Sequence, residues 1–216
     1  MMLKFRRLLE QHKLAERLFA EVGRVLQGSS MTLKTGTIVD ATIIAAPSST
    51  KNADRQRDPE MHQTRKGQQW YFGMKLHIGL DSQSGLAHSA VVTPANIHDK
   101  HPLPDLLHGQ ERRVYGDSAY ASQKELIQCK APKAKDSPNE RVRKAGQVDD
   151  AKRAKNRSKS KIRARMEHVF AVVKRLWGFT KVRCRGLAKN ASRGFTVFTL
   201  INLYLSRRWL VAAVRP

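Results

Sequence analysis

The stretch Thr37-Ile-Val-Asp-Ala-Thr-Ile-Ile-Ala45 carries the clearest structural signal in the sequence. Its β-branched residues favour a strand, and apolar side chains fall on both faces of that strand. Because such a strand needs cover on both sides, we predict that it lies at the centre of a sheet enclosed by helices. One acid, Asp40, lies in the middle of this strand.

Further strands are predicted along the chain. Residues 70–80 and 87–92 are strand-like and flank a polar turn, which indicates a β-hairpin. A short strand is expected from Arg112 to Gly116, directly before Asp117. The polar interval 47–67 has no clear period, so we predict a loop there.

Helical patterns surround these strands, so we predict an α/β fold with a helix at each end. The first pattern is an amphipathic helix that ends at Gly28. The expected helices cover residues 3–26, 99–107, 122–128, 160–176 and 192–214.

The composition restricts the class of partner. Of the 216 residues, 41 are Lys or Arg and 18 are Asp or Glu, so the formal net charge is +23. This charge indicates a polyanionic partner, nucleic acid first and an anionic membrane surface second. The longest apolar run, 195–205, is about half the length that a membrane span needs. Cys129 and Cys184 form no disulfide framework or zinc motif, so we expect a cytosolic protein.

Much of the positive charge lies in one interval. Residues 130–163 contain 13 Lys or Arg and 4 Asp or Glu, a net charge of +9 over 34 residues with few apolar side chains. We predict a solvated linker or a flexible basic insertion here, over residues 130–161.

Three acids lie in apolar surroundings, namely Asp40, Asp117 and Glu167. Burying a carboxylate is costly unless a cation or hydrogen bonds satisfy it, and Mg²⁺ prefers oxygen ligands. Three such acids could form a metal site for phosphoryl transfer. Each acid taken alone is more commonly a surface charge, a helix cap or an ion-pair partner.

One face of the expected helix around Glu167 combines opposite charges. Ser160, Arg163, Glu167 and Lys174 fall within about 60° of one another at 100° per residue. The pattern is compatible with an ordinary Arg–Glu pair on a solvated face. The functional interpretation is a metal-binding acid with cations placed to hold DNA phosphates.

Several blocks of the sequence resemble insertion-sequence transposases of the DDE class, in the group called insertion sequence five and its relative, insertion sequence four. The resemblance covers nearly the whole chain from Leu3. The blocks that carry it are Val39 to Pro47, His62 to His77, Tyr115-Gly-Asp-Ser-Ala-Tyr120, Glu167 to Asn190 and Asn202-Leu-Tyr-Leu205.

The resemblance implies a ribonuclease H-like fold, with a mixed sheet flanked by helices and catalytic acids at Asp40, Asp117 and Glu167. It also implies a Tyr-Arg-Glu-Lys signature, which Arg163, Glu167 and Lys174 fit, whereas Ser160 replaces the usual Tyr. The implied cofactor is Mg²⁺, with Mn²⁺ as a substitute. Asp40 would bridge two ions, and each of the other acids would hold one, for cleavage at transposon ends and strand transfer into target DNA.

The implied partner is double-stranded DNA, bound by a homodimer or a higher assembly in the nucleoid. Trp70 is a candidate for base stacking, although its apolar neighbours favour a place in the core. His77 and His168 are either structural hydrogen-bonders or proton carriers. The candidate phosphate contacts are Arg163, Lys174, Lys75, Arg183 and Arg185.

The same resemblance divides the chain into a helical segment, 1–30, and a catalytic domain, 31–216. Family members have a DNA-binding region before the point where this chain starts, so we expect a C-terminal part, a truncated copy or a separately translated frame. Four alternatives remain: a non-catalytic DNA-binding remnant, a regulator that forms mixed oligomers, an RNA-binding protein, and a different ribonuclease H-like nuclease.

Overall fold

The expected central strand is β1 (Gly36–Ala45), which lies inside a six-stranded mixed sheet in the computed structural model of the chain. The structure describes residues 2–31, 35–53, 55–139, 143–144 and 147–214. On one side β1 pairs antiparallel with β3 (Gln69–Asp81), and on the other it pairs parallel with β5 (Arg113–Tyr115). The prediction of a central strand is therefore confirmed.

The remaining strands extend the sheet in both directions. β4 (Ala87–Pro94) forms the predicted hairpin with β3, and β6 (Lys135–Asp136) pairs parallel with β5. The resulting order, β4-β3-β1-β5-β6, has three antiparallel strands followed by two parallel ones, and the sixth strand, β2 (His62–Lys66), pairs antiparallel with the first part of β3. This order confirms the expected α/β, ribonuclease H-like sheet.

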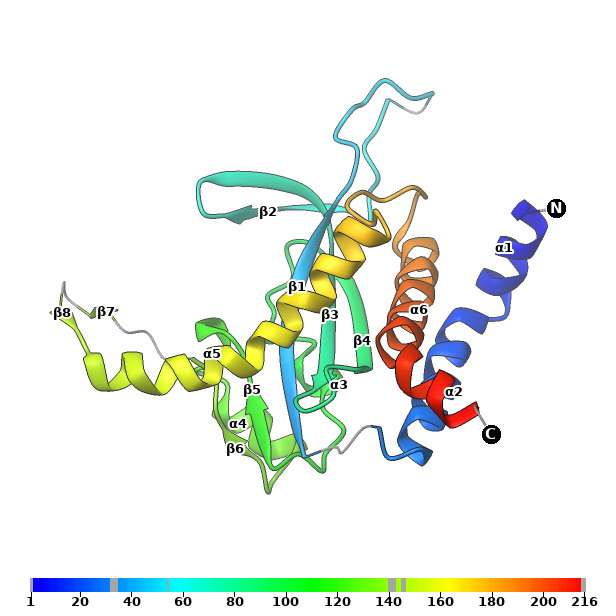
Figure 1. Cartoon of the computed structure of the whole chain (residues 1–216). Coiled ribbons are helices and arrows are strands. Elements are labelled where there is room, and N and C mark those ends of the chain that lie inside the picture. The colour runs from blue at the N-terminus through cyan, green and yellow to red at the C-terminus, as the bar shows by residue number, and fades with distance from the viewer. Residues whose placement is uncertain (1, 32–34, 54, 140–142, 145–146, 215–216) are drawn as a thin grey trace.

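Helices cover both faces of this sheet, and α5 crosses it diagonally in Figure 1. No helix in the described part of the chain is long and apolar enough to cross a membrane. The helices are α1 (Met2–Gln11), α2 (Leu14–Gly28), α3 (Leu103–Leu106), α4 (Lys124–Lys130), α5 (Asp150–Ala171) and α6 (Leu187–Val214), with a 3-10 turn, η1 (Ser118–Tyr120), and a π-helical turn, Val172–Leu176.

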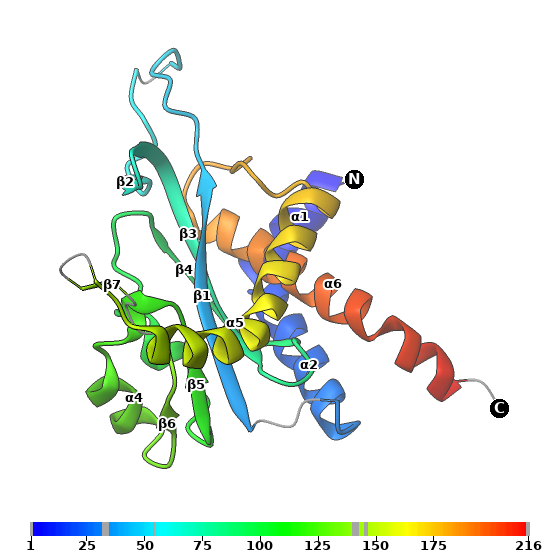
Figure 2. The same ribbon diagram turned by 60° about the vertical axis from the view of Figure 1, so that its left-hand side comes forward.

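Two hydrophobic clusters fill the space between the sheet and its helices, and β1 contributes to both. Ile38 belongs to the larger cluster, together with Met166 of α5 and Phe198 of α6. Its neighbour Val39 points into the smaller cluster, which α3 and α4 cover. Alternation along β1 thus explains its two apolar faces. Figure 2 shows the helices on either side of the sheet edge.

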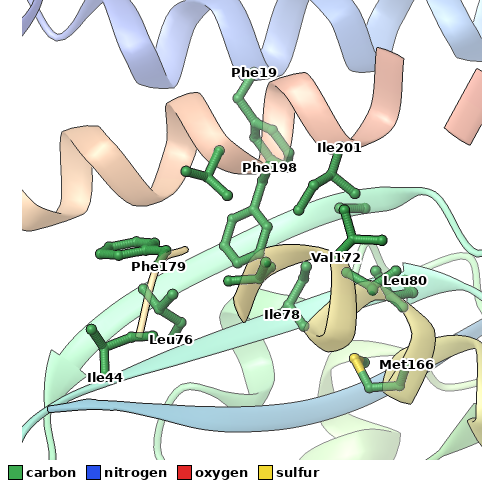
Figure 3. Close-up of a cluster of buried hydrophobic side chains, with 14 of the residues drawn as sticks. Phe19, Ile44, Leu76, Ile78, Leu80, Met166, Val172, Phe179, Phe198 and Ile201 are labelled. Carbon is green, nitrogen blue, oxygen red and sulfur yellow. The ribbon is translucent and has the colours of Figure 1, made fainter. Parts of the chain in front are cut away.

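Residues 2–30, the described part of the N-terminal segment, pack against the rest of the fold. In Figure 3, Phe19 of α2 lies above Phe198, whose ring points from α6 toward the sheet. The two rings are 6.5 Å apart between centroids, and both residues belong to the larger cluster. The described part of this segment is therefore packed on α6.

Asn202 ties α6 to the outer strand. Its side-chain amide donates to the carbonyl of Ala87 over 2.7 Å and accepts from the Ala87 N–H over 2.8 Å. Both backbone groups of a strand residue are thereby satisfied by one buried side chain. The block Asn202 to Leu205 therefore anchors α6 to β4.

Several predicted boundaries are wrong. The expected helix over residues 3–26 is broken at Lys13, whose φ of 50° lies in the left-handed region. The loop expected over 47–67 contains β2 (His62–Lys66), which pairs with β3. The helix expected from Ser160 begins at Asp150, so the second part of the predicted basic linker is helical. A short hairpin of β7 (Arg143–Lys144) and β8 (Gln147–Val148) precedes it.

Candidate acid pocket

The register of β1 and β5 places two of the predicted acids side by side. The last parallel partners are Ile38 and Tyr115, and the two strands separate beyond them. Asp40 and Asp117 each lie two residues past that pair. Adjacent strands are about 4.8 Å apart, and ligand sites commonly form where neighbouring strands diverge at their carboxyl ends. The two carboxylates consequently face one pocket, whose volume is about 180 Å³.

Asp40 is only partly compensated by its neighbours. Its Oδ1 accepts the N–H of Ala41 over 2.7 Å, and its Oδ2 lies 3.4 Å from Nη2 of Arg163 on α5. Burial raises the pKa of Asp40, and the nearby Asp117 carboxylate adds to this effect, although Ala41 and Arg163 oppose it. Burial of the carboxyl, more than repulsion by its neighbours, therefore disfavours the ionised form of Asp40.

A third acid in the pocket was missed by sequence reasoning. Asp99 follows β4 and lines the same pocket as Asp40 and Asp117. Its Oδ1 accepts from Nζ of Lys75 over 2.9 Å, and the same ammonium donates to the carbonyl of Ile97 over 2.8 Å. Lys75, predicted as a phosphate contact, is thus engaged inside the pocket. No clear sequence signal identifies Asp99, because it lies in a loop five residues past the end of β4.

Two buried aromatic groups lie behind the acids. Tyr120 is 1% exposed, and its hydroxyl has no hydrogen-bond partner in the described structure. Burial raises the pKa of Tyr120, and the negative charges of Asp99, Asp40 and Asp117 raise it further. His77 is fully buried, and its Nε2 lies 2.8 Å from the hydroxyl of Thr93. Burial lowers the pKa of His77 to about 4, so its ring is neutral near pH 7.

Glu167 lies outside this cluster. It is exposed on α5, one turn beyond Arg163, and it is not among the residues that line the pocket. Arg163 pairs with Asp40 rather than with Glu167, which differs from the ordinary pair on one helix that the sequence also allowed. Lys174, further along the same face, lies close enough to Lys66 for the two charges to interact. Glu167 therefore lies on α5 between Arg163, which contacts Asp40, and Lys174, which is near the pocket residue Lys66.

The family of the chain follows from comparison with known proteins. A family model described as a transposase DDE domain matches residues 31–203. The chain belongs to the transposase DDE domain family. No solved structure matches the chain.

Domains of the DDE transposase family generally use divalent metal ions. In the part of this transposase domain that the structure describes, no group of three or more His, Cys, Asp or Glu side chains is arranged to hold a metal ion. Two carboxylates nevertheless fit Mg²⁺, because this ion commonly takes one or two protein carboxylates and completes its shell with water and phosphate oxygens. Burial raises the pKa of Asp40, and a bound cation would favour the ionised carboxylate there.

The other predicted DNA contacts of the transposase domain lie apart from one another. Trp70 is 63% exposed on β3, so its expected place in the core is wrong. It pairs across the strands with Arg65, which lines the acid pocket. Burial lowers the pKa of Lys174, with Lys66 contributing. Arg183 and Arg185 are exposed and border a different pocket, next to the loop that follows β1.

Proposed function

We propose that this chain is a DNA transposase that cleaves DNA at transposon ends and joins the freed end to target DNA. The observation that carries the proposal is the position of Asp40 and Asp117 at the point where β1 and β5 diverge. A half-buried acid pair beside cations suits a phosphodiester whose charge must be neutralised while it reacts.

Asp40 and Asp117 are the proposed core of the metal site. Glu167, on α5, is the proposed third carboxylate ligand. Bound Mg²⁺, or Mn²⁺ in its place, would activate an oxygen nucleophile and stabilise the leaving 3′-oxygen. The protein needs no covalent intermediate with DNA, because the carboxylates act through charge and position.

The cations at the rim have a separate task in this proposal. Arg163 balances Asp40 in the structure and can turn its guanidinium to a phosphate. Arg65 and Lys66 line the pocket from the β2–β3 hairpin, and the exposed Trp70 on the same hairpin is placed to stack on a base. Lys75 holds Asp99 in place. His77 is a structural hydrogen-bonder, since it is neutral and buried.

The expected partner is double-stranded DNA, bound by a homodimer or a higher assembly in the nucleoid of the cytoplasm. Arg183 and Arg185 are proposed phosphate contacts outside the pocket. We also propose the division into a helical segment, 1–30, and a catalytic domain, 31–216.

The test is metal-dependent cleavage by substituted chains. We expect Asp40→Asn to abolish Mg²⁺-dependent nicking of a duplex taken from the DNA that flanks the gene, while binding to that duplex persists. Asp105→Asn, an exposed acid on α3, is the matched control and should cleave normally. Cleavage retained by Asp40→Asn would contradict the proposed function.

One observation favours a second candidate, a non-catalytic DNA-binding or regulatory remnant. Glu167 is exposed and outside the acid pocket. If Glu167 completes the site when DNA binds, Glu167→Gln should lose cleavage as completely as Asp40→Asn does. If the unsubstituted chain binds DNA yet shows no single-turnover cleavage, the remnant is the correct assignment.

A further inference from the structure

The first half of α5, residues 150–161, is a strongly basic helix that extends past the sheet toward β7 and β8 (Figure 1). We name this segment the basic arm. Its only apolar residues are Ala151 and Ala154, and its only acid is Asp150. The six cations are Lys152, Arg153, Lys155, Arg157, Lys159 and Lys161.

The arm has no core beneath it. Further along α5, Ile162, Met166 and Val169 face the sheet and belong to, or pack against, the larger cluster. Lys155 precedes Ile162 by seven residues and therefore lies on the same face of the helix. Lys155 is exposed and Lys159, seven residues before Met166, is half-buried, so the face that is buried in the second half of α5 is only partly covered in the arm.

The arm is nevertheless a fixed helix. Asp149 caps it by accepting the N–H of Lys152 over 3.0 Å. Farther along, Nζ of Lys159 donates to the carbonyl of Pro138 over 2.7 Å. These contacts position the arm, but they bind few of its charges.

Most cations of the arm repel one another. In the described part of the chain, none of Arg153, Lys155, Arg157 and Lys161 has an ion-pair partner. Arg153 and Arg157, Lys155 and Lys159, and Arg157 and Lys161 are all four residues apart, which destabilises a helix when the charges are alike. Because like charges in these positions destabilise the helix, a polyanion bound beside them would stabilise it.

The spacing of the charge matches one strand of DNA. Arg153, Arg157 and Lys161 lie four residues apart on one face of the helix, so at about 1.5 Å per residue they follow one another about every 6 Å. A DNA strand carries about one phosphate per 3.4 Å of axis, so this row matches about every second phosphate of one strand. The arm lacks the apolar face that an interfacial membrane helix needs, so DNA is the better match than a lipid surface.

We propose that the basic arm binds the phosphate backbone of double-stranded DNA and guides it to the acid pocket. The proposal rests on the proposed function for the identity of the polyanion. The link to the pocket is the helix itself, because Arg163, which contacts Asp40, continues the arm directly. Arg153 lies about 15 Å further along the helix axis, or four to five base pairs along a duplex.

Phosphate contacts of this kind carry no sequence information. The arm should therefore strengthen binding to any duplex, and its contribution should weaken steeply with salt.

The test is the salt dependence of duplex binding by two matched triple variants of the full chain. The first, Arg153→Gln/Arg157→Gln/Lys161→Gln, removes three arm charges that lie four residues apart on one face of the helix, and all three residues are exposed. The control, Lys4→Gln/Arg7→Gln/Arg17→Gln, removes three exposed charges from α1 and α2, on the opposite side of the molecule in Figure 1.

The binding partner is a 30-base-pair duplex of arbitrary sequence. In a plot of the logarithm of the association constant against the logarithm of the salt concentration, the negative slope of the arm variant should be shallower by about 2.7, at about 0.9 per lost phosphate contact. It should stay unchanged in the control. The charge-retaining variant Arg153→Lys/Arg157→Lys should keep the slope of the unsubstituted chain. Thermal unfolding of each variant verifies that the fold is intact.

Equal slopes in the arm variant and the unsubstituted chain would overturn the proposal, as would equal losses in the arm variant and the control. The same variants are also tested for binding to anionic lipid vesicles. If the arm substitutions weaken vesicle binding as much as they weaken DNA binding, the assignment to DNA is overturned. If the slope depends on the arm but the unsubstituted chain never cleaves DNA with Mg²⁺, the proposed function fails while the arm proposal stands.

Discussion

The two halves of α5 are formed for different physical reasons. The second half packs Met166 and Val169 into the larger cluster and carries Arg163 to Asp40. The first half, the basic arm, packs on no core and is capped by Asp149. One continuous helix therefore joins a segment stabilised by burial to a segment that only a polyanion would stabilise further. The comparison suggests that stability and DNA binding can be altered separately along this helix.

The largest effect is expected in the packed half. Met166→Ala removes a fully buried side chain from the larger cluster and leaves a cavity. We expect the free energy of unfolding to fall by about 2–5 kcal/mol, measured by urea denaturation. A loss below about 0.5 kcal/mol would mean that burial does not stabilise this half, and the comparison would fail.

A second test asks whether the buried side chain of His77, on β3 next to the acid pocket, makes the stability of the folded chain sensitive to low pH. The pKa of His77 is lowered from 6.5 to about 4, chiefly by burial. The unfolded chain therefore takes up a proton below pH 6.5, whereas the folded chain does so only near pH 4. The free energy of unfolding that neutral His77 contributes above pH 6.5 is therefore lost as the pH falls from 6.5 through 4. At about 1.4 kcal/mol per pKa unit, this loss is on the order of 3 kcal/mol.

His77→Gln keeps a partner for the Thr93 hydroxyl but cannot titrate. Its free energy of unfolding, measured from pH 7 to pH 4, should therefore fall less than that of the unsubstituted chain. Parallel curves would show that His77 does not cause the acid sensitivity.

A third test compares a pocket ion pair with a surface pair. Asp99→Asn leaves the ammonium of Lys75, whose side chain is 14% exposed, without its carboxylate. We expect a loss of about 1–3 kcal/mol in the free energy of unfolding. Glu21→Gln breaks an exposed pair with Arg24 on α2 and should cause no measurable loss. Similar losses in both variants would mean that the pocket is as well solvated as the surface.

The sequence was sufficient where a local pattern and the tertiary structure agree. β1 was predictable because its β-branched residues are apolar on both faces, and Ile38 and Val39 do enter opposite clusters. The β3–β4 hairpin was predictable from its turn. Asp40 and Asp117 could be expected to meet, because each follows an apolar strand segment and both strands lie in one sheet.

The sequence was insufficient where the structure depends on distant partners. β2 is polar throughout and is a strand because it pairs with the edge of β3. Asp99 becomes part of the pocket through Lys75, which is 24 residues away. Trp70 is exposed because its part of β3 extends beyond the buried sheet. The helix break at Lys13 could not be predicted, because no Gly or Pro lies near it in the sequence.

The smallest expected effect is also the sharpest test of the comparison. Lys155 lies on the same face of α5 as Met166, eleven residues earlier, so Lys155→Ala repeats the first substitution in the unpacked half. No core contact is lost, alanine is the best helix former, and repulsion between Lys155 and Lys159 disappears. We expect unfolding in urea to show a gain of up to about 0.5 kcal/mol, larger at low salt because salt screens the repulsion. A loss comparable to that of Met166→Ala would show that the arm is held by packing, and the contrast between the two halves would be wrong.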